Sequence, residues 1–224
     1  MTKYLPKLAA LLLTTNLACG QNVVEKYAPA NEQEKAELDM EKDNYSAAAE
    51  KLNRVLETEP ENHTARSLLA AAYAAQAGIT TLGLIKSAAG VRSTGGTAAK
   101  AFTTILPTAT LDSLTLMGLA CDAMAAIPSD SRTTEMKLQY GLFFSSYAFL
   151  QIKYFADNPD ALASLTAADA AKLILTLAKA SEIGGSSPLS TAAAAFATTL
   201  EQAPGSSVEK VKLAIGANSS GSGG

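Results

Sequence analysis

The spacing of apolar residues limits how this chain can fold more than any other feature. Between residues 46 and 57 they recur at positions i, i+4, i+7 and i+8, which places them on one face of an α-helix. The residue before a proline is pushed out of helical geometry, so Glu59 and Pro60 end this helix. The spacing therefore predicts a helix with one buried face, formed by Ala48, Leu52, Val55 and Leu56.

A second helix is expected directly after this turn, ending near Gly78. Its apolar face is formed by Ala65, Leu68, Leu69, Ala72 and Tyr73. Strand signals are scarce in the rest of the chain, which is 48% hydrophobic, rich in alanine and free of tryptophan. Small side chains of this kind suit helices that pack closely. We therefore expect an all-α fold that begins with antiparallel helical hairpins.

More helices are expected on both sides of this hairpin. One precedes it at 32–42, and two follow it at 79–89 and 97–105, separated by the glycine-containing segment 90–96. A long helix at 111–127 has few charges and is expected to be central. Its apolar residues are Leu111, Leu114, Leu119, Met124 and Ile127.

The last part of the chain is also expected to be helical. Thr166 has the residue type of an N-cap, with Asp169 three residues later, and it would begin a helix that ends at the glycines of 184–185. The tail at 217–224 has the composition of a disordered linker. The other expected helices lie at 133–156, 189–202 and 207–215.

The hairpin resembles the tetratricopeptide repeat, a family of helical-repeat proteins. In residue type and spacing the family's pattern is followed by Asp43-Asn44-Tyr45, Ala48, Leu52, Val55 and Pro60-Glu61-Asn62, and then by Ala65, Leu69, Ala70 and Tyr73. The match covers residues 32–78. The resemblance implies a solenoid of stacked helix pairs whose apolar faces are covered by neighbouring units.

The resemblance also implies an organisation and a use. Its expected parts are a signal at 1–18, a tether at 19–31, hairpins at 32–89, a degenerate helical-repeat region of the same domain at 97–216 and a tail at 217–224. Tetratricopeptide lipoproteins of bacterial envelopes act as scaffolds or assembly factors that hold partner proteins. In this chain the partner-binding groove would include Arg66, Leu69 and Tyr73, although Leu69 and Tyr73 could also simply pack between helices.

The first twenty residues have the order of an export signal. Lys3 and Lys7 precede an apolar run at 8–13, and a short segment at 17–20 follows, which contains Cys19. The run is too short to span a bilayer, which needs about 20 apolar residues. The segment resembles the signal of bacterial lipoproteins, which implies that Cys19 receives diacylglycerol and becomes the new N-terminus.

The fate of Cys19 has two further readings. Ordinary signal peptidase could cleave before Gln21, which would leave a soluble periplasmic protein. A disulfide with Cys121 is opposed by the apolar surroundings of Cys121, which suit a buried small side chain. If Cys19 is lipidated, Gly20 after it favours the outer membrane, with the protein facing the periplasm. The expected partners are then envelope proteins and, through the anchor, the membrane itself.

The segment at 140–155 is the other candidate for a functional surface, because the helix at 133–156 holds seven of the chain's thirteen aromatic residues. Such a helix belongs either to the core or to an apolar chamber that holds a ligand or a partner helix. In the second case the protein would be similar to the helical-repeat subunits that accompany some solute transporters. The residues of this candidate surface are Tyr140, Phe143, Phe144, Tyr147 and Tyr154.

Catalysis and nucleic-acid binding find no support in the sequence. The single histidine, His63, lies at a turn, where a hydrated residue is expected, and no nucleophile elbow or Cys/His metal spacing is present. The net charge is −3 and no basic stripe exists that could neutralise phosphates. We therefore expect a noncatalytic protein with no metal and no cofactor.

The lipid anchor leads to a direct test. A Cys19→Ser change should release the protein from membranes into the soluble envelope fraction, because no other segment is expected to attach it. Fractionation of cells that express the full chain measures this. Membrane association that is unchanged by the substitution would count against lipidation.

Overall fold

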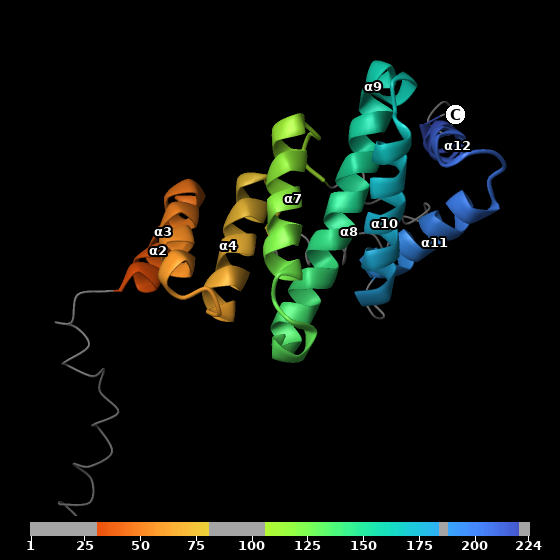
Figure 1. The fold of residues 1–224 in the computed structure, drawn as a ribbon. Coiled ribbons are helices and arrows are strands. Elements are labelled where there is room, and N and C mark those ends of the chain that lie inside the picture. Colours follow the sequence, from red (N-terminus) through yellow and green to blue (C-terminus); the bar gives the residue numbers. More distant parts are fainter. Residues whose placement is uncertain (1–30, 81–105, 184–187, 220–224) are drawn as a thin grey trace, which may run out of the picture. The chain divides into compact units, whose positions relative to one another are not determined.

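The structure is a computed structural model that describes residues 31–80, 106–183 and 188–219. Within these residues it contains nine α-helices, one short 3-10 helix and no strand, so the expected all-α class is confirmed for this part of the chain (Figure 1). The expected signal, Cys19, and the helices predicted at 79–89 and 97–105 lie wholly or mostly outside the described residues. Ile79 and Thr80, which are described, are not helical.

The hairpin predicted from apolar spacing is present. It consists of α3 (Tyr45–Thr58) and α4 (His63–Gln76), preceded by α2 (Glu32–Glu41). The side chain of Asn62 caps α4 by accepting a hydrogen bond from the backbone N–H of Ala65, 2.9 Å away. Buried residues of the three helices form one core cluster: Ala36, Ala48, Ala49, Leu52, Val55, Ala65, Leu69 and Ala72.

The helix α2 buries only Ala36, and polar contacts also connect it to α3. Glu32 forms ion pairs with Lys35, 2.8 Å away, and with Arg54 of α3, 2.9 Å away, and these lower the pKa of Glu32 to about 2. Asp39 pairs with Lys51 of α3. Exposed ion pairs such as those of Glu32 contribute little to stability, so the packing of Ala36 remains important for α2.

The helix α4 is shared between two core clusters. One of its faces packs against α3, and its opposite face, with Ala70, Ala74 and Ala77, belongs to a larger cluster that continues into α7 (Leu111–Ala125). Alanines on both faces allow neighbouring helices to approach closely. Tyr73 packs against both clusters and therefore links them.

The sequence does not indicate which face of α7 is buried. The helix packs against α4 and α8, and Leu111 is 65% exposed and Leu119 is 42% exposed. The buried positions have the spacing of one helix face and are Ser113, Met117, Ala120, Cys121 and Met124. Close contact with α4 and α8 thus selects a face that contains alanine and cysteine.

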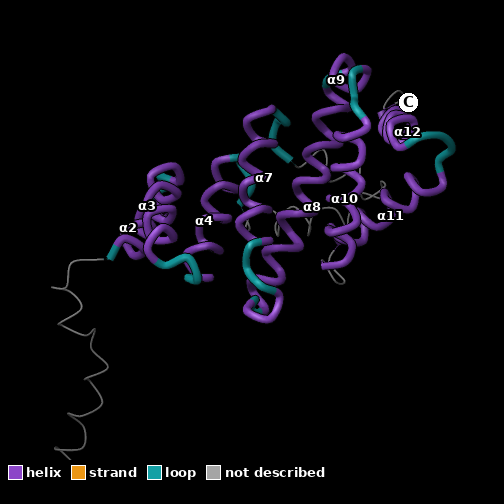
Figure 2. Tube along the Cα trace, in the orientation of Figure 1, coloured by secondary structure: helices purple, strands orange, loops and turns teal. Residues whose placement is uncertain are grey.

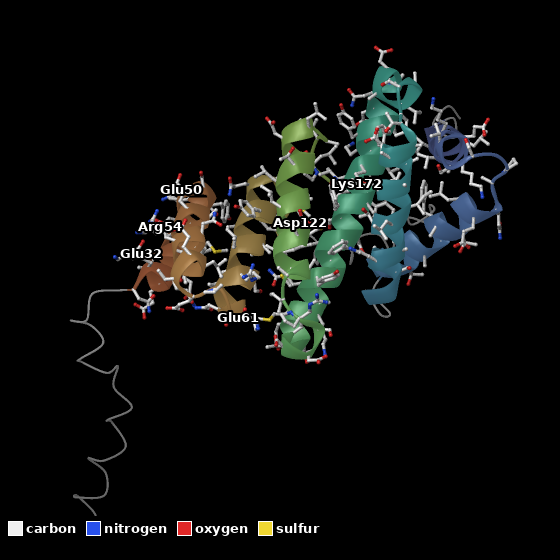
Figure 3. The ribbon with its side chains drawn as sticks, viewed as in Figure 1. Glu32, Glu50, Arg54, Glu61, Asp122 and Lys172 are labelled. Carbon is white, nitrogen blue, oxygen red and sulfur yellow. The ribbon has the colours of Figure 1, made fainter. Side chains whose placement is uncertain are left out.

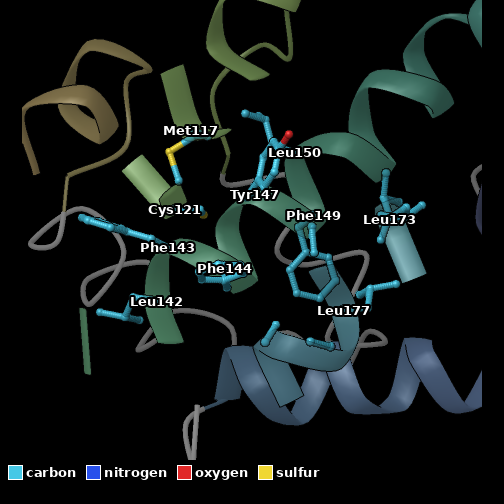
Figure 4. Packing of buried hydrophobic residues seen from close by; sticks show 14 of the residues in the cluster. Met117, Cys121, Leu142, Phe143, Phe144, Tyr147, Phe149, Leu150, Leu173 and Leu177 are labelled. Atoms are coloured by element: carbon cyan, nitrogen blue, oxygen red, sulfur yellow. The ribbon is translucent and has the colours of Figure 1, made fainter. Parts of the chain in front are cut away.

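The helix α8 (Thr134–Asp157) is the centre of the larger cluster. Every residue from Tyr140 to Ile152 is buried, and α8 contacts α7, α10 (Ala167–Ile183), α11 (Pro188–Gln202) and α12 (Ser207–Ser219). Figure 4 shows part of this packing, including Phe143, Phe149 and Leu177. Burial on all sides explains the aromatic content of this helix.

Two differences from the sequence-based expectations concern chain connections. A five-residue helix, α9 (Pro159–Ala163), lies between α8 and α10, and a 3-10 helix, η1 (Ser129–Ser131), precedes α8; neither was expected (Figure 2). The helix α12 continues to Ser219, so residues 217–219 are helical, although the tail was expected to be disordered from residue 217. None of the described helices is long and apolar enough to cross a membrane.

The burial of α8 predicts a contrast between two leucines on this helix. Leu150 is fully buried, so Leu150→Ala should lower the free energy of unfolding by about 2–5 kcal/mol. Leu138 is 53% exposed, and Leu138→Ala should change it by less than about 1 kcal/mol. Urea unfolding of the full chain measures both variants. Equal losses would contradict the placement of Leu150 in the core.

Candidate functional site

A pocket of about 370 Å³ lies where α8 and α10 adjoin α7 and α9. Its volume falls in the range of small-molecule sites in proteins. The apolar part of the lining comes mainly from Leu111 and Leu114 of α7 and from Tyr154 and Phe155 of α8. The polar part is formed by Thr115, Tyr147, Gln151, Ser164, Asp169 and Lys172.

One stripe of α8 forms much of the pocket wall. Tyr147, Gln151 and Tyr154 occupy positions i, i+4 and i+7, which lie on the same face of a helix. Tyr147 and Gln151 are buried, and Tyr154 is half-buried. The helical period therefore brings a phenol, a carboxamide and a second phenol to one side of this helix.

Tyr147 approaches α7 closely at Gly118. A Cβ added at Gly118 would lie 3.4 Å from the Tyr147 hydroxyl oxygen, so an alanine would just touch the ring system and a larger residue would displace it. On the other side of Tyr147, the ammonium of Lys172 lies over the ring, 5.6 Å from its centroid. Tyr147 is thus held between α7 and α10 at the pocket.

Lys172 supplies a positive charge to the pocket. Its pKa is raised, first by the side chain of Tyr147 and then by the negative charges of Asp122 and Asp169, so the ammonium is protonated at neutral pH. Figure 3 labels Lys172 on α10 and Asp122 on α7. Lys172 forms no ion pair with any residue that the structure describes.

Asp169 has a structural role at the start of α10. Its Oδ2 accepts hydrogen bonds from the Thr166 hydroxyl, 2.6 Å away, and from the Thr166 backbone N–H, 3.2 Å away. The Thr166 hydroxyl in turn accepts from the Asp169 backbone N–H. This reciprocal capping confirms Thr166 as the N-cap expected from the sequence.

Gln151 is the unusual polar residue of the pocket. It is 6% exposed, and its carboxamide makes no hydrogen bond to any residue that the structure describes. Its carboxamide atoms are not among the buried side-chain atoms that lack a hydrogen-bond partner, so solvent in the pocket reaches them. Because Gln151 lines the pocket, its carboxamide can be satisfied by whatever fills that pocket.

The aromatic residues singled out from the sequence divide into two groups. Tyr147 and Tyr154 line the pocket, whereas Tyr140, Phe143 and Phe144 do not and are buried in the core. Tyr140 stacks on Phe144 with the ring centroids 4.4 Å apart. The guanidinium carbon of Arg132 lies over the Tyr140 ring, 4.2 Å from its centroid. Of the five residues of the predicted surface, only Tyr147 and Tyr154 therefore line this pocket.

The residues expected to form a tetratricopeptide-like groove pack within the hairpin. Leu69 is buried in the α2–α4 cluster. The Tyr73 hydroxyl accepts a hydrogen bond from the Asn53 amide of α3, 3.1 Å away. A terminal nitrogen of Arg66 donates to the Pro60 carbonyl, 2.5 Å away, and ties the turn before α4. Leu69 and Tyr73 thus pack between helices, which is the alternative to a partner-binding groove that the sequence also allows.

Other reactive residues lie apart from the pocket. Cys121 is a free thiol, and burial raises its pKa far above the usual value, which makes it unreactive. His63 is the first residue of α4 and is half-buried rather than hydrated, with its Nδ1 lacking a hydrogen-bond partner. Among the described residues, no group of three His, Cys, Asp or Glu side chains could hold a metal ion.

The sequence-based selection missed Gln151 and Lys172. A signal for Gln151 was present, since it is the sole amide in the apolar run from 140 to 152. Lys172 could not be found in this way, because only the packing of α10 against α8 brings it to Tyr147.

Comparison of the chain with protein-family models, with curated proteins and with solved structures gives no match. Function is therefore inferred from the geometry of the pocket and the chemistry of its residues.

The state of Gln151 leads to a stability test. Gln151→Leu should change the free energy of unfolding by less than about 0.5 kcal/mol, because the carboxamide has no hydrogen bond to a described residue and is reached by solvent in the pocket. Gln139→Leu is the matched control on the same helix. Its side chain is hydrogen-bonded to Ser67 at 2.6 and 3.3 Å, so this variant should lose about 1 kcal/mol.

Urea unfolding of both full-length variants measures the difference. A loss of stability in Gln151→Leu as large as that in Gln139→Leu would mean that the Gln151 carboxamide is needed by the fold itself.

Proposed function

We propose that this protein is a noncatalytic binding protein of the bacterial envelope that holds a small, largely apolar molecule in the pocket between α7, α8 and α10. The observation that carries the proposal is Gln151, a largely buried residue whose carboxamide has no hydrogen bond to a described residue and lines a pocket of about 370 Å³. Ligand sites typically combine apolar walls with a few converging polar groups. Leu114, Tyr154 and Phe155 supply such walls, and Tyr147 and Lys172 supply further polar groups.

The pocket residues favour binding over catalysis. A lysine acts as a nucleophile or base only when it is neutral, and the raised pKa of Lys172 opposes that state. Asp169 is engaged in capping α10. The lining contains neither histidine nor cysteine, so the pocket lacks the usual pairing of a nucleophile with a base.

The envelope location in this proposal rests on the N-terminal sequence. Residues 1–18 would direct export, and a diacylglycerol on Cys19 would hold the protein at the outer membrane, facing the periplasm. Cleavage by ordinary signal peptidase would instead give a soluble periplasmic protein. In either case the pocket would meet molecules of the envelope, and a transporter-associated role is one use of such a binding protein.

A second candidate function is that of a protein–protein scaffold with a tetratricopeptide-like arrangement. The supporting observation is that α2 packs against α3 and α3 packs against α4, so consecutive helices are neighbours, as in repeat proteins. The inward packing of Leu69 and Tyr73 argues against the groove expected for this function. We therefore place ligand binding first.

Filling the pocket tests the proposal. Thr115 is an exposed residue of the lining, and its hydroxyl donates to the Leu111 carbonyl, 2.9 Å away. Thr115→Trp should place an indole in the pocket and weaken binding of 2-naphthol, a small neutral apolar probe, at least about tenfold. The fluorescence of 2-naphthol, titrated with the full chain, measures the affinity.

A matched control lies on α11. Thr198 is also exposed, and its hydroxyl donates to the Ala194 carbonyl, 3.0 Å away, but it does not line this pocket. Thr198→Trp should bind 2-naphthol like the unmodified chain. The proposal fails if the unmodified chain does not bind the probe, or if Thr115→Trp binds it equally well.

A further inference from the structure

The size of the pocket limits its occupant. At roughly 30 Å³ for each non-hydrogen atom, the share that a water molecule has in the liquid, a pocket of about 370 Å³ holds about 12 such atoms. That excludes a lipid with two long acyl chains. A single chain of about ten carbon atoms with a small head group fits.

Part of the pocket lining is apolar and exposed. Leu111 is an exposed large apolar residue of the lining, and Leu114 and Phe155 also line the pocket. Covering Leu111 with an aliphatic chain would remove apolar surface from water, which favours binding.

The lining also carries charge, from Lys172 and Asp169. Oδ2 of Asp169 accepts two hydrogen bonds from Thr166, and this carboxylate supplies the negative charge at the N-terminus of α10. Lys172 forms no ion pair with a described residue, and it is the cation of the lining that an anionic head group can pair with. The negative charges of Asp122 and Asp169 act on Lys172 as well, so the attraction of an anion is reduced.

Two side chains that donate hydrogen bonds complement this charge. The carboxamide of Gln151 has two N–H donors without a described partner, and the Tyr147 hydroxyl has one donor beside Lys172. A carboxylate accepts hydrogen bonds at both oxygens, so it can bond to Gln151 while it pairs with Lys172.

From these observations, and resting on the proposed function, we propose that the pocket binds a single-chain amphiphile with a carboxylate head group and an apolar chain of about ten carbon atoms. The head group is held by Lys172 and Gln151. The chain lies against Leu111, Leu114 and Phe155.

The experiment compares three probes of equal chain length: decanoate, 1-decanol and decyltrimethylammonium. Each is titrated into the full chain at neutral pH, below its critical micelle concentration, and binding is measured by calorimetry. Decanoate should bind about three- to tenfold more tightly than 1-decanol, because the mouth of the pocket is partly exposed and the charge is screened. Decyltrimethylammonium should bind most weakly.

Two lysines of α10 provide a matched pair of variants. Lys179 lies over the Phe144 ring at 5.4 Å, much as Lys172 lies over the Tyr147 ring at 5.6 Å, but Lys179 does not line the pocket. Lys172→Met should reduce the affinity for decanoate to that for 1-decanol, and Lys179→Met should leave the advantage of decanoate intact. Gln151→Leu should weaken decanoate binding about fivefold.

The outcomes separate the two proposals. Equal binding of decanoate and 1-decanol, with no effect of Lys172→Met, would overturn the head-group assignment while leaving the pocket as a binding site. Tightest binding of decyltrimethylammonium would overturn it in favour of a cation held by Asp169. Unchanged decanoate affinity in Gln151→Leu would remove the carboxamide from the site. Absence of binding by all three probes would contradict the proposed function as well.

Discussion

Burial of α8 on all sides is the constraint on which the rest of the structure depends. Every residue from Tyr140 to Ile152 is shielded by α7, α10, α11 or α12, so each of these helices must present an apolar face to it. The close approach of α7 at Gly118 and the fully buried Leu173 and Leu177 of α10 meet this requirement (Figure 4). A helix segment surrounded in this way has no solvent-exposed face. Any polar side chain on it must be accommodated by its immediate neighbours or by a cavity.

The buried polar residues of α8 are accommodated in two ways. Ser145 and Ser146 are fully buried, and their hydroxyls have no hydrogen-bond partner among the described residues. Their side chains are small, so each places only one hydroxyl in the core. Gln151 is larger, and it lies where the packing around α8 ends at a pocket. The carboxamide thus combines burial by the protein with access to a guest molecule, which is a typical arrangement at binding sites.

The sequence predicts the helices of this fold better than their contacts. Apolar spacing at Leu52 and Val55 and the capping pair of Thr166 and Asp169 are local signals, so α3 and the start of α10 were predicted within about two residues. Which face of α7 is buried depends on neighbours that are distant in sequence, so the exposure of Leu119 could not be predicted from the local pattern. The pocket was half predicted: Tyr147 and Tyr154 belong to one helix, whereas Lys172 reaches them only through packing.

The pocket itself follows from how the chain connects α8 to α10. Asn158 ends α8, with its amide donating to the Tyr154 carbonyl at 2.7 Å, and Pro159 then begins the short helix α9. The residues that α9 and its end present to the pocket are Ala161 and Ser164, which are too small to fill the space beside Tyr154. Larger residues there would occupy part of the space beside Tyr154. The pocket is thus bordered by small side chains of one connection, and most of the polar groups around it belong to helices that the core fixes.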